Sequence, residues 1–400
     1  MKEITSSITA AKGFKALGLH CGIKKKKKDL GVIYSESPAK CEAFFTTNAL
    51  ISAHIQIDKQ YLKKSSHIRA IIVNSGNANC CTGENGLNDC LSMAGETAKV
   101  FGIRQEEVLA ASTGVIGRRM PIEKIRKAIL KFPSLIDEKG AHDFAHSILT
   151  TDIVTKEVAV AIEISGKEVR IGGASKGAGM VNPNMATTLM FITTDVAIDK
   201  KALKKAAKTA LDNSLNVITI DGDMSPNDSL FIMANGEAKN KVIVANGPDF
   251  EKFSEALSYV CNKLAKLLVK DAEGAGKFVS IKVKKASTKK QAQIIACGIA
   301  NSLLFKTMIH GGDPNWGRVV SAAGSADKKV NINKLDIYFG KNKVFGNGEP
   351  VKIDLEILRK TLIQDEIEIV LDLKSGEHEA LKYTCDLSAE YVRINSKYTT

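Results

Sequence analysis

Apolar residues recur at helical spacing in three stretches of the chain. Residues 121–132, 201–211 and 250–268 each place apolar side chains three and four positions apart, so that they fall on one face of a helix. Pro121 suits the first turn of the first stretch, since a helix needs no amide hydrogen there. Each stretch therefore predicts a helix that buries one face in a core.

Shorter apolar runs lie between these helices. Residues 70–73, 158–164, 241–244 and 277–283 alternate or run together in the way that buried strands do. The sequence EISGKEVRI at 163–171 has a Ser-Gly pair between two such runs, which is typical of a hairpin. The pattern predicts an α+β fold with mixed or antiparallel sheets.

The length of the chain predicts more than one core. Its 400 residues exceed what a single hydrophobic core usually serves, so two domains are expected. Repeats and low-complexity linkers are missing, which favours a broad contact between the domains. The Gly-rich stretch at 173–187 is the predicted boundary.

Composition places the chain among soluble proteins. Hydrophobic residues make up 44% and charged residues 25%. The N-terminus has no apolar segment and no run of about 18 apolar residues occurs. The eight Cys residues form no C-x-x-C pair, as expected of reduced thiols. We expect a cytoplasmic protein with no membrane contact.

A net charge of +13 raises the question of a nucleic-acid partner. Lys and Arg are spread along the chain, and the one block, Lys24–Lys28, is expected in a solvated hairpin loop. A basic surface would equally attract small acidic metabolites. A nucleic-acid-binding protein stays an alternative, although no Arg and aromatic motif supports it.

Two polar groups could suggest a metal. His142 and His146 have the i, i+4 spacing of zinc ligands, but Asp143 replaces the usual Glu and no third ligand is evident. Asp221, Asp223 and Asp228 resemble a calcium loop only loosely. We expect an exposed pair of histidines and a polar turn, and no metal; a metalloprotease is the weaker alternative.

The stretch PNMATTLMF at 183–191 is the strongest candidate for catalysis. A Gly- and Pro-bearing approach leads two hydroxyls, Thr187 and Thr188, into the start of a predicted strand. A threonine needs a base to become a nucleophile. Peptide cleavage before it would supply an α-amine with a pKa of about 7.7–8.0. Ala186 is the small residue such a cut would require, and either threonine fits.

Other stretches could complete a site. Thr113-Gly114 in ASTGVIG could present amides to an oxyanion, although a structural turn explains it as well. The loop NSGNANCCTG at 74–83 follows a predicted buried strand and would lie at the edge of a site. Lys176 could bind a substrate carboxylate.

These motifs together resemble one enzyme family. KGAGMVNPNMATTLMFITTD, GFKALGLHCGIKK, VNSGNANCCTG, ASTGVIG, LTTD, IDGDMSPND, KDAEGAGK, HGGDPNWGR and YVRINSKY occur in family order from near residue 8 to the end of the chain. The chain is thereby similar to the ornithine acetyltransferases, or glutamate N-acetyltransferases, of arginine biosynthesis.

The resemblance implies self-cleavage between Ala186 and Thr187, giving an α chain of 1–186 and a β chain of 187–400. It makes Thr187 the nucleophile, with its own amine as base, and Thr113 and Gly114 the oxyanion hole. The implied substrate-binding residues are Thr150, Lys176, Thr187, Glu273, Asn395 and Thr400.

The implied reaction moves an acetyl group from N2-acetylornithine to glutamate through an acetyl-threonine. It needs no cofactor, and the resemblance leaves open whether acetyl-CoA also serves as a donor. Paired αβ units, an α2β2 heterotetramer, are the implied assembly. The alternative within a similar fold is an N-terminal-nucleophile amidohydrolase or aminopeptidase, for which water would be the acceptor.

Overall fold

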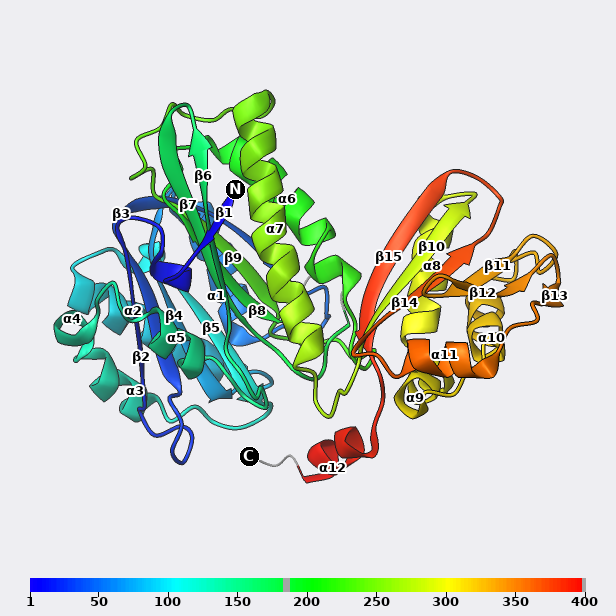
Figure 1. The fold of residues 1–400 in the computed structure, drawn as a ribbon. Coiled ribbons are helices and arrows are strands. Elements are labelled where there is room, and N and C mark those ends of the chain that lie inside the picture. Colours follow the sequence, from blue (N-terminus) through cyan, green and yellow to red (C-terminus); the bar gives the residue numbers. More distant parts are fainter. Residues whose placement is uncertain (183–187, 398–400) are drawn as a thin grey trace.

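The computed structural model describes residues 1–182 and 188–397, which form two mixed sheets flanked by helices (Figure 1). The larger sheet has nine strands in the order β1-β6-β7-β8-β9-β3-β4-β5, with β2 paired to β3. The smaller sheet has six, in the order β13-β12-β11-β14-β10-β15. The predicted α+β class with mixed sheets is confirmed.

The strands of the larger sheet are β1 (Lys2–Ile4), β2 (Phe14–Leu19), β3 (Leu30–Phe45), β4 (Ile68–Asn77), β5 (Val108–Val115), β6 (Lys156–Ile164), β7 (Lys167–Lys176), β8 (Leu189–Thr194) and β9 (Ser229–Ala234). Those of the smaller sheet are β10 (Phe278–Ala286), β11 (Asp336–Phe339), β12 (Asn342–Gly346), β13 (Glu349–Pro350), β14 (Glu366–Asp372) and β15 (His378–Cys385). The described helices are α1 (Ala53–Lys64), α2 (Gly83–Phe101), α3 (Ile122–Ile129), α4 (Phe132–Leu135), α5 (Ala141–Ser147), α6 (Lys200–Asp212), α7 (Pro248–Lys270), α8 (Lys289–Ala300), α9 (Leu303–Gly311), α10 (Gly317–Ala326), α11 (Leu355–Leu362) and α12 (Ala389–Lys397), with short 3-10 turns at Ser7–Thr9, Gln105–Glu107 and Leu215–Val217.

Helices cover both faces of the larger sheet, and β8 shows why its first four residues are all apolar. Leu189 and Phe191 enter the core shared with α1, α2, α3 and α5, whereas Met190 and Ile192 enter the core shared with α6 and α7. Because successive side chains of a strand point to opposite faces, a strand between two helical layers buries both of its faces.

The strands β8 and β9 lie between strands from earlier in the chain. They are parallel to each other, while β8 is antiparallel to β7 and β9 is antiparallel to β3. The strands that precede and follow residues 183–187 of the predicted boundary, β7 and β8, therefore belong to one sheet. The division between the two sheets falls instead between α7 and β10.

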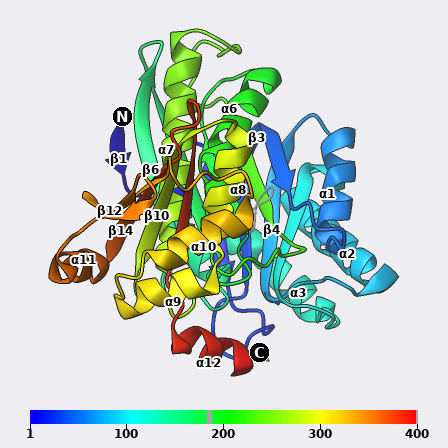
Figure 2. The same ribbon diagram turned by 90° about the vertical axis from the view of Figure 1, so that its right-hand side faces the viewer.

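The two sheets share a core at their junction. Phe278 of β10 and Tyr383 of β15 have tilted rings with centroids 5.2 Å apart, and both join the core of α6 and α7. The outer face of the smaller sheet is covered by α8, with α9 and α10 beside it (Figure 2). Contacts between the two units involve β15, which touches α7 and the 3-10 turn at Leu215–Val217. The helix α12 then returns beneath the larger unit (Figure 1).

Most predicted elements are confirmed, and one is wrong. The helices α3, α6 and α7, the strands β4, β6 and β10, and the β6–β7 hairpin are where the pattern places them. Residues 241–244 form no strand and keep a single bridge, Ile243 to Ile198. Val242 and Val244 are 55% and 60% exposed, so an apolar run here does not mark a strand buried in a sheet.

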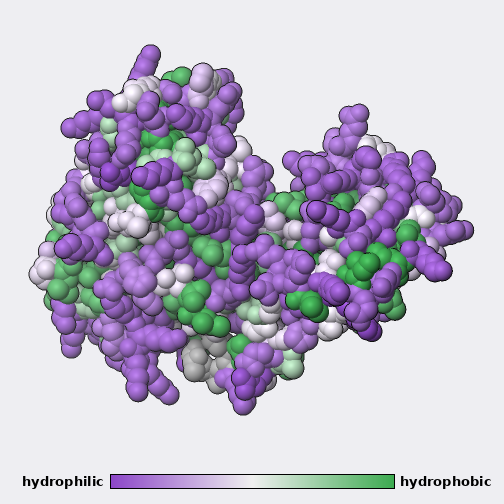
Figure 3. Space-filling view, in the orientation of Figure 1, coloured by the Kyte–Doolittle hydropathy of each residue, from purple (hydrophilic) through white to green (hydrophobic). Residues whose placement is uncertain are grey.

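No single helix among residues 1–182 and 188–397 is long and apolar enough to cross a membrane; α8 and α9, bent by 58°, reach that composition only as a pair. Their apolar faces pack in the core of the smaller sheet. On the face shown in Figure 3, hydrophilic side chains cover most of the surface, and apolar ones form small groups over both units.

Phe191 should be among the most sensitive positions of the larger sheet. Its ring is fully buried and lies 5.5 Å from Phe231 and 5.3 Å from Phe144. Phe191→Ala should lower the free energy of unfolding in urea by about 3–5 kcal/mol, because it leaves a cavity in the core shared with α1, α2, α3 and α5. Leu135→Ala, at a side chain 49% exposed, is the control and should change it by less than about 0.5 kcal/mol. Equal effects would contradict this account of β8.

Candidate active site

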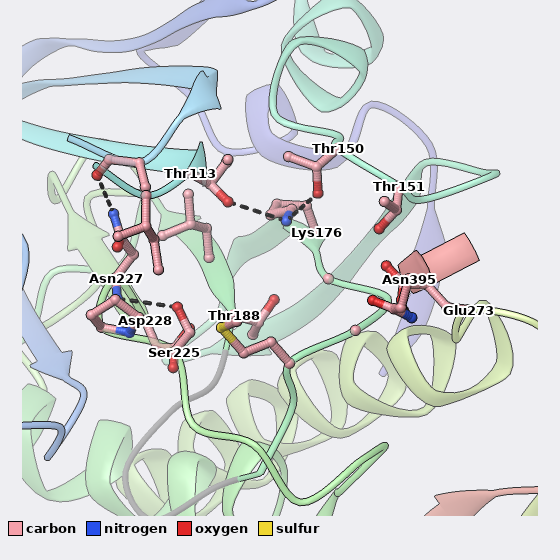
Figure 4. A pocket seen from close by; sticks show the side chains of 18 residues that line it. Thr113, Thr150, Thr151, Lys176, Thr188, Ser225, Asn227, Asp228, Glu273 and Asn395 are labelled. Atoms are coloured by element: carbon pink, nitrogen blue, oxygen red, sulfur yellow. Dashed lines mark hydrogen bonds between the residues drawn. The ribbon is translucent and has the colours of Figure 1, made fainter. Parts of the chain in front are cut away.

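Six of the predicted site residues line one cavity of about 140 Å³ at an end of the larger sheet: Thr113, Gly114, Thr150, Lys176, Glu273 and Asn395 (Figure 4). They come from the end of β5, the loop after α5, the end of β7, the segment after α7, and α12. The fold thus gathers positions that span most of the sequence. Ala186, Thr187 and Thr400 lie outside the described residues.

Lys176 lies at the centre of the cavity wall. Its ammonium donates to the Thr150 hydroxyl at 2.7 Å and to the Thr113 hydroxyl at 3.2 Å (Figure 4). Burial lowers the pKa of Lys176, and the Asp152 carboxylate, 4.0 Å away, partly offsets this effect. A buried ammonium held by two hydroxyls is suited to bind a carboxylate.

The backbone at Thr113-Gly114 requires glycine. Gly114 has φ of +133°, and a Cβ there would lie 2.3 Å from the carbonyl carbon of Gly76. The close approach follows from the parallel pairing of β4 with β5, which sets Gly76 opposite Gly114. Ala78, in the predicted edge loop 74–83, also lines the cavity. The geometry leaves this backbone turn open to the cavity.

A buried ionic cluster lies behind Lys176. The Asp152 carboxylate accepts hydrogen bonds from the amides of Thr150 and Gly177 and from Lys156 Nζ at 2.6 Å. Lys156 Nζ also pairs with Asp271, which follows α7. The side chains of Asp152 and Lys156 are fully buried. Burial opposes ionisation of Asp152, but Lys176, Lys156 and the Gly177 amide together hold the pKa of that carboxyl below its usual value.

The cluster joins three segments that line the cavity. Asp152 fixes the segment of Thr150 and the residue after Lys176, and Asp271 lies two residues before Glu273. We conclude that Asp152, Lys156 and Asp271 set the spacing of three cavity residues without lining the cavity themselves. Sequence reasoning missed these three residues. The only local signal was the spacing of four residues between an Asp and a Lys beside Thr150, and this spacing is too common to identify an ionic cluster.

Glu273 and Asn395 form a second wall. Asn395 Nδ2 of α12 donates to Glu273 Oε2 at 2.7 Å. A Cβ on Gly179 would lie 2.5 Å from the same oxygen, so glycine is needed for the chain to pass this carboxylate. Tyr391 holds α12 in place by donating to Asp221 at 3.2 Å.

The wall facing Glu273 carries Thr188, Ser225, Asn227 and Asp228 (Figure 4). Asn227 Nδ2 donates to the carbonyls of Ala78 and Ser112, which ties this wall to β5. The sequence alone predicted a polar turn at 221–228. The structure confirms a turn but also brings its end, Asp228, into the cavity.

A model of the ArgJ family matches residues 15–400 of the chain. The Arginine biosynthesis bifunctional protein ArgJ of Caldanaerobacter subterraneus subsp. tengcongensis is 43% identical over 404 residues, with 100% of both chains covered. This chain belongs to the ArgJ family. The family predicted from the sequence motifs is thereby confirmed.

Two solved structures are similar to this chain in sequence. ArgJ from Bacillus halodurans is 41% identical, with a TM-score of 0.44 over 46% of this chain and 97% of that chain. Ornithine acetyltransferase from Mycobacterium tuberculosis, solved in complex with ornithine, is 32% identical, with a TM-score of 0.43 over 46% of this chain and 99% of that chain.

Two features of this ArgJ family member lie apart from the cavity lining. His142 and His146 are exposed on α5, where His142 Nδ1 lies 2.7 Å from Glu157; within the described ranges no group of three or more potential metal ligands forms. The Lys24–Lys28 block lies in the β2–β3 hairpin loop, as expected. Lys24 differs from the solvated lysines expected there, because it donates to the carbonyls of Leu149 and Lys28.

The ionic cluster of this ArgJ family member should dominate local stability. Asp152→Asn leaves Lys156 and Lys176 short of a buried counter-charge, so the free energy of unfolding at pH 7 should fall by about 3–5 kcal/mol. Asp212→Asn, which breaks an exposed pair with Lys208, is the control and should change it by less than about 1 kcal/mol.

The pH dependence has a definite sign. The pKa of Asp152 is lower in the folded chain than its unfolded value of about 3.9. Ionised Asp152 therefore stabilises the fold above that value, and the contribution is lost as pH falls through the lowered pKa. The difference in the free energy of unfolding between wild type and Asp152→Asn, measured by urea titration, should become smaller as the pH is lowered. A difference that does not change with pH would contradict this role of Asp152.

Proposed function

We propose that this chain is an acetyltransferase of arginine biosynthesis that moves the acetyl group of N2-acetylornithine to glutamate, giving ornithine and N-acetylglutamate. Membership of the ArgJ family along almost the whole chain supports the activity. The observation that carries the site assignment is the Lys176 ammonium, buried in the cavity and bonded to both Thr113 and Thr150.

The substrate binds with its charged groups on separate walls. Lys176, with the Thr150 hydroxyl, pairs with the α-carboxylate that acetylornithine and glutamate have in common. Glu273, with its Asn395 partner, holds the side-chain ammonium of ornithine. Thr400 and Thr187 complete the pocket. Because Lys176 is buried and Glu273 is partly exposed, the carboxylate lies deeper than the ammonium.

Thr187 is the nucleophile of this proposal. Its hydroxyl attacks the acetyl carbonyl while its own α-amine takes the proton. Because the Thr113 hydroxyl accepts a hydrogen bond from Lys176, its own proton remains available for the oxyanion. The Gly114 amide is the second donor. The carbon–nitrogen bond then breaks, ornithine takes the proton from the Thr187 amine, and an acetyl ester remains.

Glutamate completes the exchange. Its amine attacks the ester, the tetrahedral oxyanion is again held by Thr113 and Gly114, and N-acetylglutamate leaves as the Thr187 hydroxyl re-forms. Water must be a worse acceptor than glutamate, so the occupied pocket has to exclude it. Acetyl-CoA would enter as an alternative donor to Thr187, and no cofactor or metal takes part.

The Thr187 amine arises from cleavage of the Ala186–Thr187 bond, so the working enzyme consists of chains 1–186 and 187–400, assembled as α2β2. Thr187→Ala should remain a single chain of 43.1 kDa and be inactive. Denaturing electrophoresis with N-terminal sequencing checks this, and the wild-type β chain should begin Thr-Thr-Leu.

Thr188→Ala is the matched variant and should still be cut. If Thr188→Ala blocks cleavage and Thr187→Ala does not, the nucleophile has been assigned to the wrong threonine. Active wild-type enzyme in one piece would contradict the cleavage altogether.

The acceptor separates this proposal from an amidohydrolase. In an acetyl exchange, glutamate should accelerate steady-state release of ornithine from N2-acetylornithine, with N-acetylglutamate formed in equal amount. Chromatography of both products measures it. Ornithine release that is unchanged by glutamate and yields acetate would instead identify a hydrolase.

A further inference from the structure

Asp228 is a carboxyl that neither the fold nor the proposed reaction uses. It lines the cavity, is only 3% exposed, and its Oδ2 is buried without a hydrogen-bond partner among the described residues. Buried carboxylate oxygens are almost always paired, since an unpaired one is costly. Asp228 lines the cavity, and the described part of the chain supplies no partner for its buried Oδ2, so the carboxyl is available for a role in the site.

The register of the sheet places Asp228 beside the start of β8. In the parallel pair β8–β9, Leu189 lies opposite Ser229, and the Ser229 amide donates to the Thr188 carbonyl at 2.9 Å. Thr188 and Asp228 are therefore neighbours at the ends where both strands begin. Thr188 Oγ1 is likewise buried without a described partner. Thr188 and Asp228 thus each have a buried side-chain oxygen without a described partner, and both residues line the cavity.

The surroundings of Asp228 favour the protonated form of its carboxyl more than solvent would. Burial raises the pKa of Asp228 well above its usual value, and hydrogen bonds from Ser225 and the charge of Lys176 only partly offset this. His54 of α1 bonds the neighbouring Ser229 at 3.2 Å, and burial lowers its pKa to about 3, so it is neutral at pH 7. Glu273 lies on the opposite wall.

The exchange has one proton that the Thr187 amine does not handle. Glutamate enters with a protonated α-amine, which must lose a proton before it can attack. Ornithine leaves as a free amine and must gain one. The Thr187 amine moves one proton in each half-reaction, from its own hydroxyl to ornithine and from the attacking glutamate nitrogen back to that hydroxyl, so the second proton of each substrate amine is left over. A second proton carrier is therefore needed at the reacting nitrogen.

We propose that Asp228, supported by Ser225, is a further catalytic residue that carries the proton of the substrate amines. This inference rests on the proposed acetyl exchange. Neutral Asp228 gives its proton to the departing ornithine amine, which leaves as an ammonium, and Asp228 becomes a carboxylate. The carboxylate then takes a proton from the ammonium of glutamate and frees its lone pair for attack. Each cycle returns Asp228 to its neutral form.

The decisive comparison uses two acceptors on the same acetyl-enzyme. Purified enzyme is acetylated with N2-acetylornithine, freed of substrate, and mixed with glutamate or with hydroxylamine, which is uncharged at neutral pH. Loss of the acetyl group from the β chain is followed by mass spectrometry. Asp228→Asn should slow the reaction with glutamate by about 10²-fold or more and leave hydroxylamine at the wild-type rate.

Ser225→Ala is the second variant, because it keeps the carboxyl and removes one support. Ser225→Ala should lower the rate of deacetylation by glutamate by about tenfold, as expected for one lost hydrogen bond to a charged group. The rate of deacetylation by hydroxylamine should stay at the wild-type value. Should Asp228→Asn fail to fold or to be cut, Ser225→Ala alone decides the question. Equal slowing with both acceptors, or no slowing with glutamate, overturns the proton-carrier role.

The two proposals fail in different ways. If the acetyl exchange is wrong, wild-type enzyme accumulates no acetyl group on its β chain. If only the role of Asp228 is wrong, wild-type acetyl-enzyme forms normally and the variants fail to discriminate between the acceptors.

Discussion

The carboxylate of Asp152 is the contact on which the cavity depends. It is fully buried, yet it meets two amides and the ammonium of Lys156 and lies 4.0 Å from Lys176. A charge in this position is tolerable only because each part of the cluster compensates another. As a result the loop of Thr150, the end of β7 and the segment after α7 cannot shift independently of one another.

The same cluster explains how one cavity can hold charges of both signs. Lys176 lies between two carboxyls, Asp152 behind it and Asp228 across the cavity, with Glu273 on the far wall. Burial lowers the pKa of Lys176, and the Asp152 carboxylate offsets part of this effect. Metabolites that share an α-carboxylate but differ in side-chain charge can then be anchored at the shared group.

Much of the fold follows from pattern, because amphipathic helices such as α6 and α7 show their period directly. The prediction of a strand at 241–244 was wrong, because an extended segment with a single bridge can have the same composition as a strand. The family motifs brought Thr113, Lys176 and Glu273 forward correctly as cavity residues. Asp152, Lys156 and Asp228 were not found this way. The pair of Asp152 and Lys156 is local, but its importance comes from burial and from Gly177 and Asp271, which are distant in sequence. That of Asp228 comes from burial, and a local pattern shows neither property.

The order of strands β7-β8-β9-β3 has a consequence for how cleavage would affect refolding. A cut before β8 leaves a two-stranded ribbon of one polypeptide clasped on both edges by strands of the other. The fragments could part only by breaking two rows of backbone hydrogen bonds and opening two cores. The intact chain folds in a unimolecular reaction. After such a cut, two denatured fragments would have to associate again in solution, so refolding would become bimolecular. Cleavage would therefore make unfolding harder to reverse once the chain has folded.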